Sequence, residues 1–85
     1  MSKHDLKVYQ KFFKALWCGD KTFEIRNNDR AFEERDEIIL QENENGSHDG
    51  YTGREIDAVI TYLTDYEQKP GFVVFSFRET SRREE

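Results

Sequence analysis

Three charged residues that lie close together in the chain, Lys21, Glu24 and Arg26, are the side chains best suited to chemistry. A lysine ammonium can hold a phosphate as a point charge, an arginine guanidinium can hold one with two parallel hydrogen bonds, and a carboxylate accepts hydrogen bonds. In a concave site the trio would grip a planar polar ligand. On an open surface the same charges would form ion pairs that each contribute less than about 1 kcal/mol. The charge pattern by itself favours this surface interpretation.

The trio lies on a predicted strand over residues 21–26 (KTFEIR), which follows a turn at Gly19. Side chains alternate between the two faces of a strand. We therefore expect Phe23 and Ile25 to face the core and the polar side chains to share the opposite face: Thr22, Glu24 and Arg26. The residues that follow, NNDR, favour a turn, because Asn and Asp bond to their own backbone.

The rest of the chain predicts one helix and four further strands. An apolar stripe at helical spacing predicts a helix over residues 9–18 that ends at Gly19, and we expect its members to lie in the core: Tyr9, Phe12, Phe13, Leu16 and Trp17. Strands are predicted over residues 4–9, 36–43, 54–66 and 72–77, with a mobile hairpin loop over residues 42–53. Residues 79–85 are predicted to be a charged, disordered tail.

These elements predict an α+β fold in the order β-α-β-β-β-β, forming one domain over residues 1–78. One helix cannot cover both faces of a flat sheet of five strands. A small, partly closed β-barrel with the helix at one end resolves this problem, because closure also removes exposed strand edges.

Composition excludes several other classes of function. The single cysteine, Cys18, rules out an internal disulfide and a cysteine-based zinc site, which favours a reducing, cytoplasmic setting. The two histidines, His4 and His48, are far apart in the chain, so we expect neither a metal nor a cofactor. No segment is apolar over the length of a membrane span, so we expect a soluble protein.

Charge is distributed unevenly along the chain. The net charge is −5, yet residues 1–30 carry seven Lys and Arg against four Asp and Glu, whereas residues 31–85 carry six against fourteen. A basic first third on an acidic body predicts local binding of a short anionic ligand rather than affinity for long polyanions.

The stretch GDKTFEIR, residues 19–26, matches the G-x-K-x-x-E-x-R signature of the ASCH domain, a PUA-like β-barrel superfamily. With the neighbouring stretches HDLKVY, NNDRAF, DEIIL, YTGREI and GFVVFSF, the chain resembles a bacterial and phage ASCH-like family that bears a domain-of-unknown-function label. The resemblance runs from about His4 to Phe77. It implies a PUA-like barrel with a cleft beside the helix, and RNA or a modified nucleotide as the ligand.

The resemblance also implies which residues line that cleft. The signature residues Lys21, Glu24 and Arg26 do so, and Thr22 shares their strand face. The extension typical of the narrower family has no assigned role and adds Asn28, Asp29 and Arg30, and the opening strand adds His4 and Lys7. Independently of the resemblance, Tyr51 is a candidate for stacking on a base, because its loop is expected to be exposed.

The chain departs from that family before the third strand. Relatives commonly have Gly-Asp there, where this chain has Arg35-Asp36. Glycine suits a turn with positive φ. The arginine therefore predicts that the turn has changed shape.

Three functions remain open from the sequence. The first is a binding module for RNA, a nucleotide or a modified nucleoside. The second is an amidohydrolase, because some ASCH proteins hydrolyse N4-acylated cytidine with a Lys, a Thr nucleophile and a Glu. Here Lys21 matches the lysine, but Glu24 stands at the threonine position and cannot supply the same acyl acceptor, so we expect no enzyme of that type. The third is a protein-interaction module that uses the acidic surface.

Overall fold

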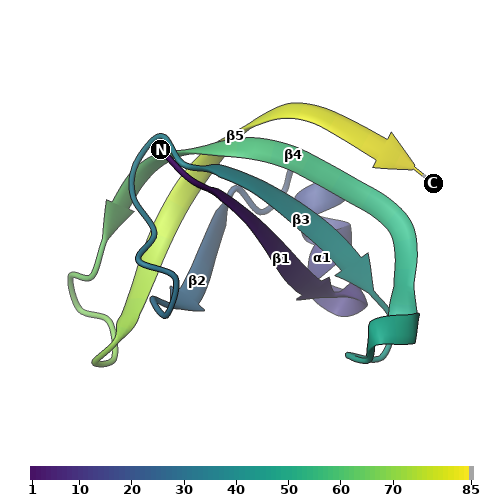
Figure 1. The fold of residues 1–85 in the computed structure, drawn as a ribbon, viewed down its shortest axis with the longest axis horizontal. Helices are drawn as coiled ribbons and strands as arrows, with labels where there is room; N and C mark the ends of the chain where they lie inside the picture. Colours follow the sequence, from purple (N-terminus) through teal and green to yellow (C-terminus); the bar gives the residue numbers. More distant parts are fainter. Residues whose placement is uncertain (85) are drawn as a thin grey trace.

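The computed structural model describes residues 1–84, in which five strands form one curved sheet beside one α-helix (Figure 1). β1 (Lys3–Tyr9) pairs in parallel with β3 (Glu37–Asn43), because α1 (Gln10–Trp17) and β2 (Phe23–Asn27) lie between them in the chain and carry it back to the same end of the sheet. β4 (Tyr51–Thr64) is antiparallel to β3, and β5 (Phe72–Glu84) is antiparallel to β4. β2 adds antiparallel to β5, which gives the order β1-β3-β4-β5-β2.

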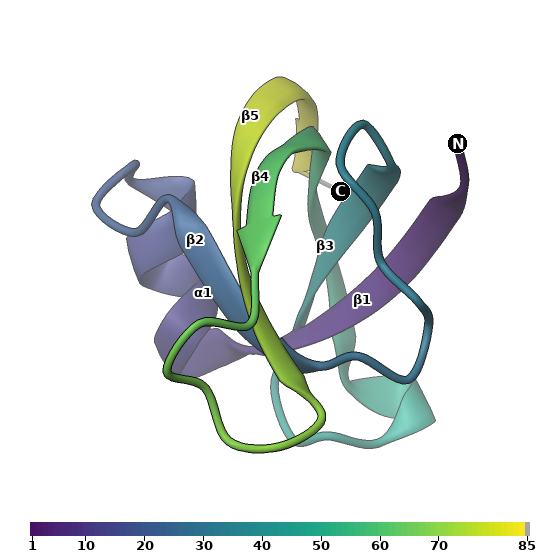
Figure 2. The same cartoon turned by 90° about the vertical axis from the view of Figure 1, so that its left-hand side faces the viewer.

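The sheet curls into an arch, and its two edge strands, β1 and β2, converge beneath it (Figure 2). The molecule is thus a small, mostly β domain shaped like half a barrel. This agrees with the predicted α+β class and with the predicted element order.

The core lies on the inner side of the arch. Alternate residues of the strands point into it, and α1 adds Phe13 and Leu16 from one end. The fully buried members come from four of the strands and from the helix: Leu6, Phe13, Ile38, Leu40, Ile56, Ile60 and Phe75.

The predicted helical stripe is only partly buried. Phe13 and Leu16 are buried and Trp17 is partly buried, but Tyr9 is 50% exposed and Phe12 is 47% exposed. The prediction was wrong for these two rings. A helix of eight residues at the end of the arch contacts the core along a narrow line, so the flanks of its apolar stripe remain in solvent.

The loop predicted over residues 42–53 is shorter than expected. β3 continues through Asn43, a 3₁₀ turn spans His48–Gly50, and β4 starts at Tyr51. The side chain of Asn43 is fully buried and organises the turn, since its Oδ1 accepts from the backbone of Asn45 at 3.0 Å and its Nδ2 donates to the Ser47 carbonyl at 2.8 Å.

β5 also differs from its prediction, because it continues through residues 79–84, where the sequence predicted a disordered tail. This part of β5 pairs with the first half of β4, for example Ile56 with Arg82 and Ala58 with Glu79. Residue 85 lies outside the described part of the chain.

Arg35 adopts a left-handed backbone conformation before β3. Its φ is +79°, a region that glycine enters readily and arginine rarely. The change of turn shape relative to the family stays a prediction. The Arg35 amide donates to the Ile60 carbonyl at 2.8 Å, which fixes this strained residue against β4.

Among residues 1–84, no helix has the length and apolar character needed to cross a bilayer.

Candidate functional site

β2 turns its charged side toward the inside of the arch. Glu24 is only 4% exposed, whereas Phe23 is 43% and Ile25 is 53% exposed. The prediction that Phe23 and Ile25 face the core was therefore wrong. The pairing of β2 with β5 explains the inversion, because Glu24 lies opposite Phe75, which is buried, and directly paired residues of two strands share a face.

Two cations clasp the buried carboxylate of Glu24. The Lys21 Nζ lies 3.4 Å from Oε2, and the Arg26 Nε lies 3.1 Å from Oε1. The side chains of the two cations are 24% and 23% exposed, whereas that of Glu24 is 6% exposed. The trio carries one net positive charge and leaves both cations within reach of a solvent-borne ligand.

Aromatic rings flank the lysine of this trio. The Lys21 Nζ lies 5.2 Å from the ring centroid of Phe12 on α1 and 5.5 Å from that of Phe23 on β2. Both distances are within the range of a cation–π contact. The lysine is therefore positioned between the helix and the edge strand, beside two exposed rings.

Arginine side chains bridge the seam between the two sheet edges. The Arg26 Nη2 donates to the Lys7 carbonyl at 2.8 Å, and the Arg30 Nη1 donates to the Asp5 carbonyl at 2.6 Å. Because the two acceptors are two residues apart on β1, both carbonyls point to the same, unpaired side of that edge strand. The guanidiniums thus satisfy acceptors that a sixth strand would otherwise bond.

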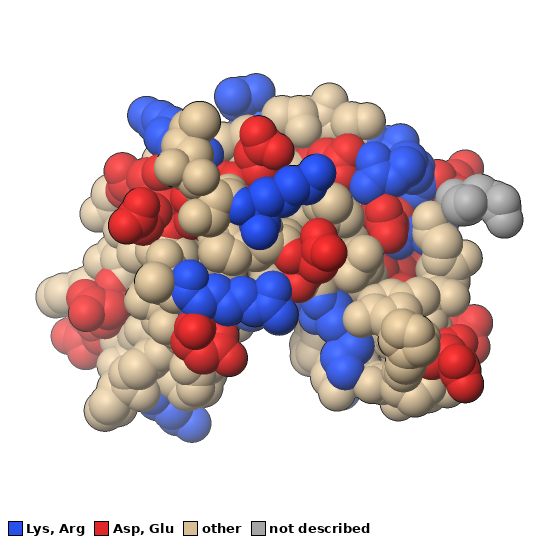
Figure 3. Space-filling model, in the orientation of Figure 1, with Lys and Arg blue, Asp and Glu red and all other residues tan. Residues whose placement is uncertain are grey.

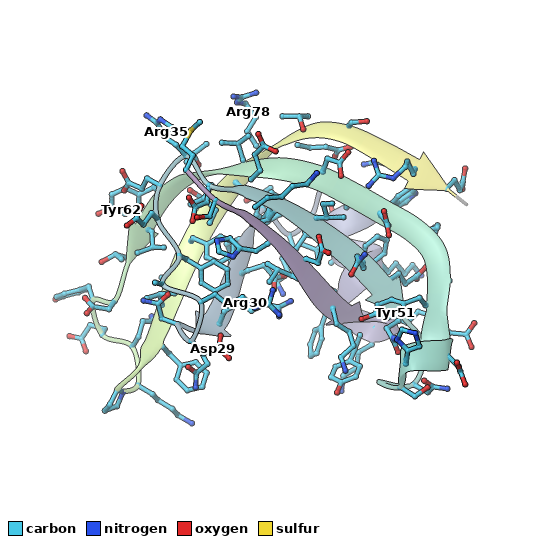
Figure 4. All side chains as sticks on the ribbon, in the orientation of Figure 1. Asp29, Arg30, Arg35, Tyr51, Tyr62 and Arg78 are labelled. Atoms are coloured by element: carbon cyan, nitrogen blue, oxygen red, sulfur yellow. The ribbon has the colours of Figure 1, made fainter. Side chains whose placement is uncertain are left out.

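The molecule is hollowed on the side where this seam lies. Figure 3 shows the hollow opening at the lower edge between two lobes, with Lys and Arg side chains gathered at its top. Figure 4 shows Arg30 beneath β1 at the top of this hollow, Asp29 on one lobe and Tyr51 on the other. Arg30 is therefore accessible from the hollow, with the acidic Asp29 on one of its lobes.

Several predicted site residues have mainly structural contacts. His4 is buried, and its Nε2 lies 2.9 Å from the Asp36 Oδ2. The Asn28 Oδ1 accepts from the Phe32 amide at 2.8 Å and so closes its own turn. The Lys7 Nζ donates to the Gly46 carbonyl at 2.7 Å.

The remaining predicted residues lie at the surface. Thr22 and Asp29 are exposed. Tyr51 is 43% exposed, and its ring stands edge-on to His48 with the centroids 6.3 Å apart. The structure thus brings together Lys21, Glu24 and Arg26 and links them through the seam to Arg30, whereas Tyr51 lies on the opposite lobe.

Asp36 anchors the start of β1 to the turn before β3. Its carboxylate accepts from the Ser2 amide at 2.9 Å and from the Glu33 amide at 3.0 Å, in addition to its contact with His4. Burial raises the pKa of Asp36, but the hydrogen bonds from His4, Ser2 and Glu33 together lower this pKa below its ordinary value. Asp36 is therefore ionised at neutral pH.

Sequence reasoning missed a second buried charge pair, Glu42 with Arg54. The Arg54 Nε and Nη2 donate to the two oxygens of Glu42, each at 2.9 Å, and the Thr52 hydroxyl donates to the same carboxylate at 2.6 Å. The hydrogen bonds from Arg54 are the main reason that the pKa of Glu42 lies below its ordinary value. Twelve residues separate the partners, so no local spacing signals the pair.

Residues 1–84 contain no group of three or more His, Cys, Asp or Glu side chains arranged to hold a metal ion.

Comparison with known proteins gives a family without an assigned function. Residues 3–77 match the model of the family described as "Domain of unknown function (DUF3850)". A curated relative, the "Uncharacterized 12.9 kDa protein in GpA 3'region" of Escherichia phage P2, is 39% identical over 62 residues. That alignment covers 73% of this chain and 54% of the relative, so the chain spans about half the length of the phage protein.

Proposed function

The chain belongs to the DUF3850 family of domains of unknown function, and we propose that it is an ASCH/PUA-like binding module for a nucleotide, a modified nucleoside or a short single-stranded RNA. The proposed site consists of Lys21, Glu24 and Arg26, with Arg30 and Thr22 at its margin.

The observation that carries this proposal is the inward-facing, buried carboxylate of Glu24 between two partly exposed cations. Burying an ionised group is costly, and an apolar residue opposite Phe75 would serve the core at least as well. Charged groups retained in such a place are typical of functional sites. The net positive trio suits an anionic or hydrogen-bonding ligand.

Each member of the trio has a distinct role in the proposed complex. Arg26 uses Nε for Glu24 and Nη2 for the Lys7 carbonyl, which holds its guanidinium in a fixed orientation for a phosphate or a base edge. Lys21 supplies a mobile point charge, and Glu24 accepts hydrogen bonds from an exocyclic amine. The acidic remainder of the chain disfavours long polyanions, so the ligand is short.

One observation favours a second function, hydrolysis of an acylated nucleoside. The Lys21 Nζ and the Glu24 Oε2 are 3.4 Å apart, so the two groups are neighbours that could act as an acid and a base if a bound substrate draws them closer. The threonine nucleophile of the ASCH amidohydrolases is replaced by Glu24 itself. Incubation with N4-acetylcytidine tests this alternative, and turnover no faster than that of Lys21→Ala removes it.

The binding function is tested by titrating 5′-nucleotides, modified nucleosides and short RNAs by calorimetry at two salt concentrations, after a thermal-shift screen. We expect Lys21→Ala and Arg26→Ala to weaken binding by about tenfold each, as expected for the loss of one charge-assisted contact. Lys69→Ala, an equal change of charge on the β4–β5 turn, is the control. Binding that is unchanged in both site variants would show that the site lies elsewhere.

A further inference from the structure

A cavity of about 550 Å³ lies between α1 and the strands β3 and β4, and its lining includes Lys11, Lys14, Trp17, Cys18 and Arg54. Its volume is within the range of small-molecule sites in proteins. Gln10, Lys14 and Trp17 recur along one side of the helix at spacings of four and three residues. Phe12, whose ring centroid lies 5.1 Å from the Lys11 Nζ and 5.2 Å from the Lys21 Nζ, stands on the other flank. The residues that line the cavity include none of those in the site proposed above.

The wall of the cavity contains a guanidinium that is already fixed in place. Arg54 is held by two hydrogen bonds to Glu42, whose side chain is 1% exposed, and its Cζ lies 4.8 Å from the ring centroid of Trp17. The donors in these two hydrogen bonds are the Nε and the Nη2 of Arg54, so neither bond uses its Nη1. The guanidinium would therefore lose little freedom when Nη1 binds a ligand.

Stability alone does not explain why this buried pair exists. Replacing a buried ion pair by apolar residues of similar volume is often neutral or stabilising. Here the pair lines a cavity, and the charged form of Glu42 is maintained by its hydrogen bonds from Arg54 and Thr52. This combination of a cavity and a perturbed, paired carboxylate is typical of a ligand site.

Two lysines add positive charge at the rim. Lys11 and Lys14 are exposed, α1 contains no acidic residue, and the ion pairs among residues 1–84 include neither lysine. Positions three apart on a helix place their Cβ atoms about 5–6 Å from each other. The Lys11 Nζ now rests 5.1 Å from the Phe12 ring centroid, and a turn of this exposed side chain toward the cavity would let both ammonium groups contact one multiply charged group. The Trp17 ring, whose centroid lies 4.8 Å from the Arg54 Cζ and 4.1 Å from the Arg82 Cζ, and the Cys18 side chain also line the cavity.

We propose that this cavity binds a small phosphate monoester with an aromatic or apolar body, whose phosphate contacts Lys11, Lys14 and Arg54 and whose body lies against Trp17. The dianionic phosphate matches the three cations that line the cavity, of which Glu42 neutralises one. A monocarboxylate would match the cations less well.

The chain offers two built-in reporters for the test, because Trp17 and Cys18 are its only tryptophan and its only cysteine and both line the cavity. Phenyl phosphate is the probe. We expect it to change Trp17 fluorescence saturably and to slow the alkylation of Cys18 by a maleimide with the same dissociation constant. Three related compounds should bind at least about tenfold more weakly. Phenol lacks the charge, inorganic phosphate lacks the aromatic body, and benzoate lacks the second charge.

Two matched variants locate the site. Lys14→Gln should weaken phenyl phosphate about fivefold to tenfold, as expected for losing one charge-assisted contact. The equivalent change on the β4–β5 turn, Lys69→Gln, should leave binding unchanged. Circular dichroism and the melting temperature show whether each variant is folded. Lys21→Ala should also bind phenyl phosphate normally, which distinguishes this cavity from the site around Glu24.

Three results would overturn the proposal. The first is that millimolar phenyl phosphate causes neither the fluorescence change nor the Cys18 protection. The second is equal affinity for benzoate, and the third is a folded Lys14→Gln variant that binds as tightly as the unchanged protein. Binding that depends on Lys21 instead of Lys14 would assign the ligand to the other site.

Discussion

At Glu24 the structure differs from the sequence-based prediction in the way that bears most on function. The alternation in β2 correctly separates Phe23 and Ile25 from Glu24 and Arg26, but hydrophobicity assigned the two sets to the wrong faces. An edge strand that exposes Phe23 and Ile25 and buries a carboxylate leaves apolar area in solvent and loses the stabilisation that its burial would give. This loss of stabilisation is the strongest sign on this strand of a role beyond folding.

We predict that Glu24→Gln lowers the free energy of unfolding by about 1 kcal/mol, because Lys21 and Arg26 then lose their shared anionic partner in a mostly buried position. Urea denaturation measures the change. Glu67→Gln, at an exposed position in the turn between β4 and β5, serves as the control and should change stability by less than about 0.5 kcal/mol. Equal stability of the two variants would show that the clasp around Glu24 does not form in solution.

At the scale of elements, β5 shows how pairing overrides composition. The residues RETSRREE lack the apolar alternation of a strand, yet through Glu84 they pair with β4. The bonds of a sheet are made by the backbone, so a polar segment forms a strand when a neighbouring strand offers a register. Arg83 reinforces this register through contacts with Glu55 and Asp57, and Arg82 lies 4.1 Å from the Trp17 ring centroid.

We predict that removing residues 79–85 destabilises the protein, since the first half of β4 then loses one of its two partner strands and keeps only β3. The free energy of unfolding should fall by roughly 2 kcal/mol or more if each lost backbone bond contributes about 1 kcal/mol. Urea denaturation compares the truncated and full chains. The double variant Arg82→Ser/Arg83→Ser retains the backbone and should lose less. A truncated chain as stable as the full one would contradict this prediction and would support the sequence-based prediction of a disordered tail.

At the scale of the whole molecule, the arch is closed by charge. Arg26 and Arg30 span the seam between β1 and β2, and carboxylates with hydrogen-bonded cations or amides hold other parts of the chain together. Hydrogen bonds from neighbouring groups lower the pKa of four carboxyls, which are Asp36, Glu42, Asp57 and Glu79. Burial opposes this shift in each of them, and at Asp36 burial is the largest single influence. Much of the fold's organisation therefore depends on ionised acids.

We predict that stability declines in acid. Since the pKa of each of these four groups is lower in the folded chain than its ordinary value of 3.8 for Asp or 4.5 for Glu, the unfolded chain binds more protons between the two values. The stabilisation is complete above the ordinary pKa values and is lost as the pH falls through the lowered ones. Urea denaturation from pH 7 to pH 2.5 should show a constant free energy of unfolding above about pH 5.5 and a steady fall below it.

Asp36→Asn isolates one of these groups. The variant should be less stable at pH 7, because the amide cannot accept all three hydrogen bonds made to the carboxylate, and its stability should depend less steeply on acidic pH. An acid limb as steep as that of the unchanged protein would show that Asp36 does not contribute to the pH dependence.

The sequence by itself determined the elements, their order and the one charged trio. Helical spacing marked α1, alternation marked β1, β2 and β4, and short apolar runs marked β3 and the first half of β5. The spacing of Lys21, Glu24 and Arg26 marked the candidate site. These features are local, because each depends on residues a few positions apart.

The tertiary structure alone decided which face of β2 is inside, that Arg26 and Arg30 bridge the seam, that residues 79–84 form a strand, and that Glu42 meets Arg54 beside a cavity. A period of two shows which side chains share a face but not which face is covered. That answer depends on the register between β2 and β5, whose paired residues lie about fifty positions apart in the chain.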